Sequence, residues 1–213
     1  MLTLITAAST LTAACTSSSD NGSGAAASDY CSLLASYVSK CNVTDACTVA
    51  TSQACTQEVT AYSTGYLDAV TSCAANFDCT DGGSSTISTC INTKVEALTP
   101  TSTQQKLATD FCNQCASSLT ETASACATSF FAANTSGTGT GAAGLGTEIL
   151  EFNDTITSSI DSSCATATVD AGVLGCVTAF EICASAVLVK AVTEPAACQS
   201  STNGSSAPLH FAR

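Results

Sequence analysis

The sequence predicts an all-α fold held together by disulfides. Between about residues 28 and 198, apolar residues recur mostly at helical spacing, and alternating β-branched runs bounded by turns are lacking. The chain has 15 cysteines among 213 residues, whereas aromatic residues make up 5% and Trp is absent. Because the apolar core is modest, crosslinks worth roughly 2 to 4 kcal/mol each would offset the deficit. We expect a disulfide-stapled bundle of about six to seven helices.

Three helices are expected in the first part of the chain. Ser28 can cap the first helix, in which apolar residues share one face as far as Cys41. The second and third are expected at about residues 53–75 and 84–98. An Asp-Gly-Gly sequence at 81–83 separates them.

Four further helices are expected after Pro100. Thr101 can cap the first of these, and the second covers about residues 120–133. Thr147 can cap the third, which buries apolar residues as far as Ile160. The last covers about residues 169–192 and ends before a proline.

Composition predicts the organisation of the chain. A short apolar and small-residue run opens it, and Ser, Gly and Ala dominate the next stretch and the segment after residue 133. We expect a signal peptide at 1–14, a flexible tether at 15–28, a cysteine-rich helical domain at 29–133, a Gly-rich loop at 134–147, a helical hairpin packed on that domain at 148–199, and a flexible tail at 200–213.

An even set of cysteines remains when Cys15 is set aside, and we expect seven disulfides among them. Disulfides persist only in oxidising compartments, which indicates an extracytoplasmic protein. The pairing cannot be derived from the sequence. An interval of five residues follows both Cys41 and Cys73, which is consistent with an internal duplication. The expected disulfide cysteines are Cys31, Cys41, Cys47, Cys55, Cys73, Cys79, Cys90, Cys112, Cys115, Cys126, Cys164, Cys176, Cys183 and Cys198.

The segment Leu11-Thr12-Ala13-Ala14-Cys15 resembles a bacterial lipobox, in which a leader peptidase cuts before a lipidated cysteine. The resemblance implies acylation of Cys15 and a membrane contact through that lipid, in the outer membrane or at the cell surface. The alternative is an ordinary leader cut near Ala14, which would give a secreted protein with Cys15 as a thiol. No apolar run is as long as a membrane span, and the longest, Ala184–Val192, is interrupted by Ser185 and Lys190.

The charge balance excludes one class of partner. The formal net charge is -12, and Lys and Arg together number 5. A basic patch cannot be assembled from so few cations, so we expect no nucleic-acid binding. A protein or an apolar small molecule remains open as a partner.

Several groups could in principle carry chemistry, and each has a structural explanation. Cys112 and Cys115 form a Cys-x-x-Cys motif, but it falls late in a helix, where structural disulfides are the better interpretation. Residues 76–84 bring carboxylates into one turn but do not follow the EF-hand order, which favours a solvated, disulfide-tied turn over a calcium site. The only histidine, His210, lies in the tail, so hydrolase triads are not expected.

A set of carboxylates near the expected start of a helix has a similarly simple explanation. Glu148, Glu151 and Asp154 step along that helix, where negative charge favours the helix dipole. We therefore expect no catalytic residue, no metal and no cofactor.

The whole chain resembles the cysteine-rich lipoproteins of myxobacteria and their relatives, with a lipobox-like end, a Ser/Gly tether and Ala/Ser/Thr-rich helices. A second likeness lies in Ala97-Leu98-Thr99-Pro100-Thr101 with Gln104, Lys106, Leu107 and Cys112, which is similar to a stretch of the elicitins, helical sterol carriers. The first resemblance implies a location, and the second implies an apolar ligand.

We expect a lipid-anchored extracytoplasmic structural or interaction protein without catalytic activity. The alternative is a lipid or sterol carrier with an apolar cavity between helices, which an enclosed pocket would favour and a filled core would contradict. An enzyme of unknown class is a third hypothesis, which would require acidic groups converging in a cleft.

Overall fold

The computed structural model describes residues 24–79, 85–116, 118–119, 121–132, 142, 144–165, 172–191 and 198. These residues are all-α, which confirms the predicted class, and their eight α-helices exceed the expected number. They are α1 (Ala25–Lys40), α2 (Ala46–Glu58), α3 (Thr64–Ala74), α4 (Ser85–Glu96), α5 (Ser102–Cys115), α6 (Ala123–Ser129), α7 (Asp154–Ile160) and α8 (Gly172–Ala191). Short 3₁₀ turns, η1 (Val59–Ala61) and η3 (Glu148–Glu151), precede α3 and α7, and a π-helical segment, η4 (Asp161–Ala165), follows α7.

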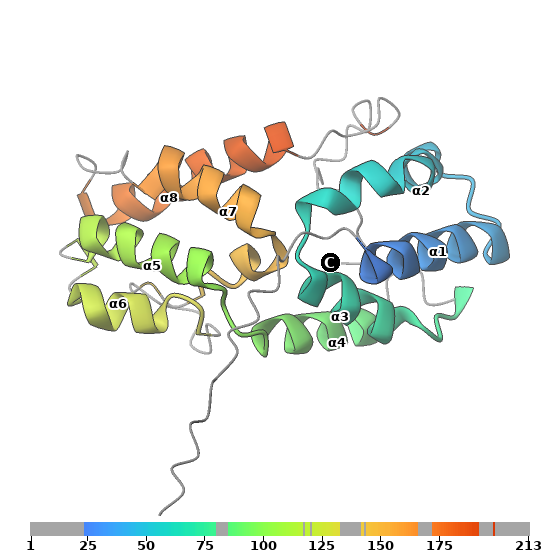
Figure 1. Ribbon diagram of the computed structural model, residues 1–213, viewed down its shortest axis with the longest axis horizontal. Coiled ribbons are helices and arrows are strands. Elements are labelled where there is room, and N and C mark those ends of the chain that lie inside the picture. The colour runs from blue at the N-terminus through green and yellow to red at the C-terminus, as the bar shows by residue number, and fades with distance from the viewer. Residues whose placement is uncertain are drawn as a thin grey trace, which may run out of the picture.

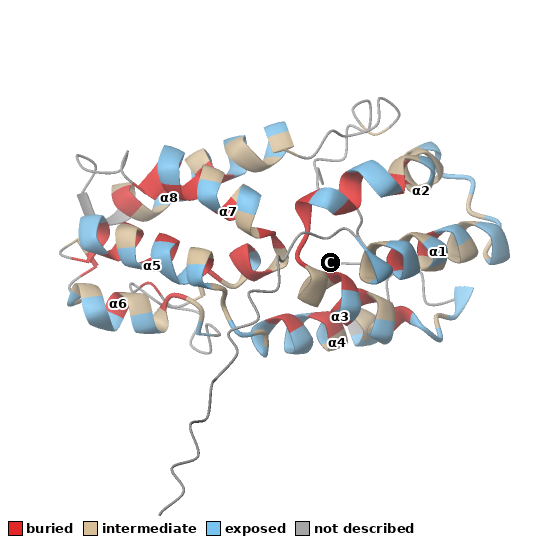
Figure 2. Ribbon diagram, viewed as in Figure 1, coloured by how far each residue is buried: buried red, intermediate tan, exposed pale blue. Residues whose placement is uncertain are grey.

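The helices form two groups that lie side by side, α1 to α4 and α5 to α8 (Figure 1). Each group has its own apolar core, and the buried residues lie on the inner sides of the helices (Figure 2). The second core is filled by aromatic rings, since the ring of Phe111 lies 4.8 Å from that of Phe180 and 5.4 Å from that of Phe130.

The two groups of helices divide at about Pro100, between α4 and α5, although Leu150 and Phe152 pack into the core of the first group. The predicted division at 134–147 stays a prediction, because much of that segment lies outside the described residues. Two of its glycines are described: Gly144 has a φ of 87°, and Gly146 packs against the ring of Phe130. These two positions require glycine for its conformation and its small size, respectively.

The two groups repeat one arrangement. In the first, Cys31–Cys55 joins α1 to α2; in the second, Cys112–Cys126 joins α5 to α6. Likewise, the third and fourth helices are joined by Cys73–Cys90 in the first group, and η4 is joined to α8 by Cys164–Cys183 in the second. Helix order and disulfide positions therefore match, as an internal duplication would produce.

The repeat is visible in short stretches of sequence once the disulfides define the register. Asp29-Tyr30-Cys31 of α1 corresponds to Asp110-Phe111-Cys112 of α5, and the helix caps Ser63 and Asn153 correspond to each other. The expected trace of duplication, the equal intervals after Cys41 and Cys73, does not follow this register, because both intervals lie in the first repeat, where Cys41–Cys79 ties the end of α1 to the turn after α3.

One inserted residue distinguishes the third helix of each repeat. From Ser63 to Cys73 the chain advances ten positions, whereas from Asn153 to Cys164 it advances eleven. The extra residue is accommodated by the π-helical segment η4. A single-residue insertion into an α-helix forms such a π-bulge, which keeps the following cysteine facing its partner.

The predicted continuous helix at 53–75 was wrong, because the chain leaves the helix at Val59 and restarts at Thr64. Between these points Tyr62 forms an isolated antiparallel bridge with Phe152. Ser63 then caps α3 by accepting a hydrogen bond from the backbone N–H of Tyr66, at 3.1 Å. Pairing with the second repeat requires extended backbone, and this requirement overrides helical periodicity.

Two other predicted caps were also wrong. Thr147 precedes η3, and the cap of α7 is Asn153, whose side chain accepts from the N–H of Ile156 at 3.0 Å. Ser28 lies inside α1, which begins at Ala25. By contrast, Thr101 caps α5 as predicted, in a capping box.

The 14 cysteines of the described residues all pair, which confirms the expected seven disulfides. Besides the four that repeat, Cys41–Cys79 lies within the first group and Cys115–Cys176 within the second. Cys47–Cys198 joins α2 to a residue seven positions beyond the end of α8, across 151 positions of sequence. It is the one disulfide among these seven that links the first group to a residue beyond α8.

Candidate functional site: the outer face of α8

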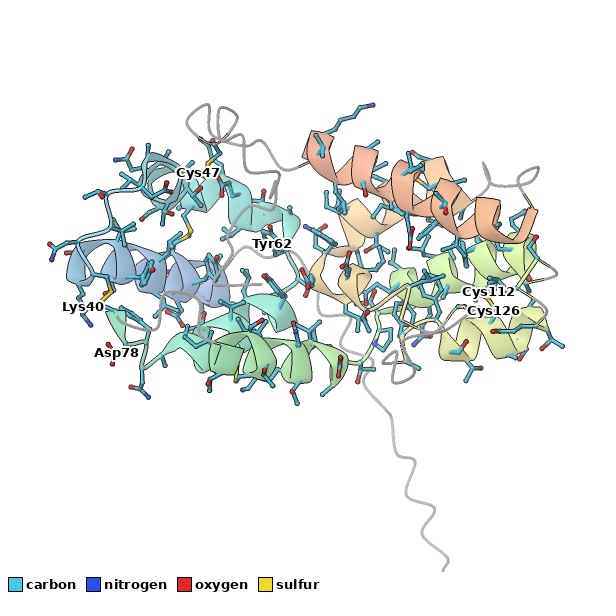
Figure 3. All side chains as sticks on the ribbon, turned by 180° about the vertical axis from the view of Figure 1, so that it is seen from behind. Lys40, Cys47, Tyr62, Asp78, Cys112 and Cys126 are labelled. Atoms are coloured by element: carbon cyan, nitrogen blue, oxygen red, sulfur yellow. A yellow bond between two sulfur atoms is a disulfide. The ribbon has the colours of Figure 1, made fainter. Side chains whose placement is uncertain are left out.

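The predicted Cys-x-x-Cys pair is divided between two different disulfides. Cys112 bonds Cys126 of α6, and Cys115 bonds Cys176 of α8. Cys112 and Cys126 lie where α5 meets α6 (Figure 3). A redox dithiol requires its two sulfurs to exchange with each other, so this geometry supports the structural interpretation.

The turn at 76–79 is tied by Cys41–Cys79, as expected. The ring of Phe77 packs edge-on against Tyr37 at 5.4 Å, and the Lys40 ammonium lies 5.6 Å from the centroid of the same ring. Residues 80–84 lie outside the described part. Among the described residues, no group of three or more His, Cys, Asp or Glu side chains could hold a metal ion.

The three carboxylates expected at a helix start are separated by the break before α7. Glu148 and Glu151 belong to η3, whereas Asp154 is the first residue of α7. The Thr101 hydroxyl donates to the Asp154 carboxylate at 2.6 Å, so this group also links the starts of α5 and α7. Favourable interaction with the helix dipole remains a sufficient role for Asp154.

Cys15 and His210 lie outside the described residues, so lipidation of Cys15 stays a prediction. None of the described helices has the length and hydropathy needed to cross a membrane.

The first repeat buries a polar side chain, Tyr30, at a position where the second repeat buries an apolar one. Tyr30 is 1% exposed, and its hydroxyl has no hydrogen-bond partner among the described residues. Glu58, 3% exposed, contributes with Tyr62 and Tyr66 to the electrostatic surroundings of Tyr30. Burial, with smaller contributions from these neighbours, raises the pKa of the Tyr30 phenol well above its ordinary value. The position equivalent to Tyr30 in the second repeat is Phe111.

The π-helical segment η4, which accommodates the inserted residue of the second repeat, begins with a residue that forms an ion pair. Lys106 of α5 binds the carboxylate of Asp161, and also that of Asp110 at 2.5 Å. Hydrogen bonds from Lys106 to Asp110 and Asp161 raise the pKa of the ammonium group above its ordinary value. Lys106 is largely exposed, whereas Asp161 is mostly buried. The ion pair joins α5 to η4, and this structural role is sufficient to explain it.

An open groove of about 840 Å³ runs between α5 and α6. Its lining includes Ala108, Ala127 and Phe131, and none of its lining residues is charged. Because the groove is open along its length, it differs from the enclosed pocket expected of a carrier.

The large exposed apolar side chains of the described residues both lie on α8. Ile182 is 66% exposed and Val189 is 72% exposed. They are seven residues apart, so they lie nearly in line, two turns apart, on one side of the helix. The exposed residues around them define what we call the α8 outer face: Thr178, Glu181, Ile182, Ser185, Ala186, Val189 and Lys190.

The first repeat provides a comparison for this face. Cys90 of α4 and Cys183 of α8 occupy equivalent disulfides, which sets the register between the two helices. In that register, Thr89 corresponds to Ile182, and Glu96 corresponds to Val189. The two helices occupy the same place in their groups, yet one exposes polar residues and the other exposes branched apolar ones. The fold therefore does not require an apolar surface at this position.

The sequence did not predict this face, since the apolar run Ala184–Val192 was considered only as a candidate membrane span. The available signal was that α8 is apolar on more than one side, which is typical of a helix with a second packing partner. No protein-family model matches the chain, and neither the curated proteins nor the solved structures contain a match.

Proposed function

We propose that this chain is a lipid-anchored, extracytoplasmic interaction protein without catalytic activity, and that it binds protein through the α8 outer face. The single observation that carries the interaction role is the apolar pair Ile182 and Val189, exposed on a helix whose counterpart in the first repeat is polar. Exposed apolar patches bordered by polar residues are typical of docking surfaces.

The proposed location rests on the disulfides and on the segment before them. Seven disulfides are stable only in an oxidising compartment, which indicates an extracytoplasmic protein. The anchor is proposed from the lipobox-like sequence ending at Cys15. A cysteine with more than one acyl chain would hold the protein stably at a membrane surface.

We propose that the protein is not an enzyme because the side chains that could take part in catalysis have structural roles. The thiols of Cys112 and Cys115 are consumed in separate buried disulfides. Lys106 and Asp161 are paired with each other. What remains distinctive on the surface is an apolar face, which binds and does not react.

Mass spectrometry of the intact purified protein tests the anchor. We expect the mass of the protein to exceed that of the polypeptide by the mass of acyl groups on Cys15. We also expect that alkylation modifies fourteen other thiols, and only after the protein has been reduced. An unmodified Cys15 would refute the anchor.

Site-specific photocrosslinking in the producing cells tests the interaction role. A photoreactive phenylalanine analogue at position 182 should give protein adducts, whereas the same group at the matched position 89 of α4 should give none. Equal labelling from both positions, or no adduct from either, would refute a role for the α8 outer face.

A carrier of apolar ligands is a second candidate, favoured by the uncharged lining of the groove between α5 and α6. The test measures binding of a fluorescent sterol or fatty alcohol to the purified protein and its displacement by the unlabelled compound. Ala127→Glu, which places a charge in the groove, is the variant expected to block binding. Binding that survives this change would exclude the groove as the ligand site.

A further inference from the structure

We infer that the partner of the α8 outer face is a second copy of this chain, bound with the two α8 helices antiparallel. This inference rests on the proposed interaction role of that face and names its occupant. The structural basis is the order of the exposed residues along α8, which matches itself when the helix is reversed.

Reversing the helix about a point between Ser185 and Ala186 exchanges Ile182 with Val189, and it exchanges Glu181 with the oppositely charged Lys190. When a second α8 runs in the opposite direction, Ile182 of one copy is level with Val189 of the other, and the same contact occurs twice. A closed two-fold dimer requires this kind of self-complementary surface.

The residues at the centre of the face allow the two helices to approach. Ser185 and Ala186 are small, and both are exposed. Packed helix axes lie about 8 to 10 Å apart, and the shorter separations need small side chains at the contact. Ile182 and Val189 can then pack beside the crossing point and bury their exposed branched ends.

The absence of net charge on the α8 outer face favours it as the dimer interface. The chain carries 17 acidic and 5 basic residues, so most pairs of surfaces on two copies would repel each other. The α8 outer face has one acid, Glu181, and one base, Lys190, and therefore no net charge. The antiparallel direction also places the two helix dipoles in the favourable orientation.

A single pair of helices gives a contact at the lower end of the size range of specific interfaces. The dimer should therefore dissociate on dilution in solution. A lipid anchor at Cys15 would confine the copies to one surface and raise their effective concentration, so that a weak contact suffices.

The test uses the purified full chain in a non-ionic detergent that keeps an acylated Cys15 in solution. Sedimentation velocity over a range of concentrations should show a monomer–dimer equilibrium. Ile182→Glu should weaken the dimer at least tenfold, and so should Val189→Lys, because each change places a charge against an apolar side chain twice. The matched control Thr89→Glu on α4 should leave the equilibrium unchanged.

Mixing the two disruptive variants tests the direction of pairing. In the antiparallel dimer, Glu at position 182 of one copy faces Lys at position 189 of the other, and the second contact remains Ile182 with Val189. The mixture should therefore form a heterodimer although each variant alone is monomeric. Wild-type protein that stays monomeric at every concentration, or a mixture that shows no recovery, would overturn the inference.

These outcomes are separable from failure of the proposed function. In one outcome, position 182 crosslinks only to proteins other than this chain, and the wild-type chain is monomeric. That outcome would support the interaction role and contradict the dimer. Crosslinks whose mass is twice that of the chain would support both.

Discussion

Tyr62 and Phe152 occupy equivalent positions in the two repeats, and they pair directly with each other. Their backbones form an antiparallel bridge, and their rings stack with centroids 5.7 Å apart at an interplanar angle of 21°. Figure 3 shows Tyr62 near the middle of the molecule, where the two groups of helices meet. The repeats therefore contact each other through the same segment, as two halves of a symmetric dimer do.

The hydrogen bonds around this pair follow the same symmetry. The N–H of Ser63 donates to the carbonyl of Glu151 at 2.7 Å, and the N–H of Asn153 donates to the carbonyl of Ala61 at 3.0 Å. The side chain of Ser63 also donates to the Leu150 carbonyl at 2.9 Å. Each cap residue thus starts its own helix and binds the opposite repeat.

Asn153→Ala should lower the free energy of unfolding by about 2 to 3 kcal/mol. The change removes the cap of α7 and leaves the carbonyl of Thr60 without the bond that it accepts from the Asn153 side chain. Guanidinium denaturation with the disulfides intact measures the loss. Asn153→Ser is the matched control, because its hydroxyl can keep the cap while the amide that bonds Thr60 is lost. A serine variant as unstable as the alanine variant would show that the cap contributes nothing.

Peptide mapping without reduction should recover Cys112 linked to Cys126 and Cys115 linked to Cys176. The physical reason is that Cys112 and Cys115 point to different neighbouring helices, α6 and α8. Replacing both Cys115 and Cys176 by Ser should lower the free energy of unfolding by about 2 to 4 kcal/mol. A peptide that contains a Cys112–Cys115 disulfide would contradict this assignment.

The fold class and the number of disulfides could be predicted because they depend on local or additive features. Helical periodicity identified most of the helices, although it merged α2 and α3 into one and missed the first half of α2. The capping box of Thr101 and Gln104 marked the start of α5 correctly. An even number of cysteines apart from Cys15 was enough to predict that all of them form disulfides, but not which cysteines bond to each other.

The breaks at Tyr62 and at Phe152 could not be predicted, because they are caused by each other. Both residues leave helical geometry to pair across ninety positions of sequence, and apolar spacing near either one gives no sign of this. The α8 outer face had the same difficulty. Exposure of Ile182 became informative only when the disulfides aligned it with Thr89 of the first repeat.

Gly146→Ala should lower the free energy of unfolding by about 1 to 3 kcal/mol. A Cβ atom at this position would lie 2.3 Å from the ring of Phe130, and a buried aromatic ring cannot turn aside easily. Gly65→Ala is the control, since its nearest neighbour, at 2.8 Å, is the end of the Leu98 side chain, which can change rotamer. Thermal unfolding of both variants measures the difference. Equal losses would show that the segment around Gly146 shifts freely.

Tyr30→Phe should leave stability unchanged or raise it by up to about 1 kcal/mol. The Tyr30 hydroxyl is buried without a hydrogen-bond partner among the described residues, and burying such a group costs free energy. Phe111, the equivalent residue of the second repeat, shows that a phenylalanine fits this place in the fold. A loss greater than 1 kcal/mol in denaturant titration would indicate that the hydroxyl has a partner in solution.

The same substitution should reduce the alkaline sensitivity of the protein. Burial raises the pKa of Tyr30 in the folded state, whereas the unfolded chain releases this proton near its ordinary value of about 10. The folded state therefore holds this proton more tightly than the unfolded chain does. The free energy of unfolding keeps its full value below pH 10 and falls as pH rises towards the folded pKa. Above pH 10, wild-type protein should lose up to about 1.4 kcal/mol per pH unit more than Tyr30→Phe. Unfolding measured at pH 9, 10 and 11, after any free thiol has been alkylated, tests this, and parallel slopes for the two proteins would show that Tyr30 ionises as readily in the folded state as in the unfolded one.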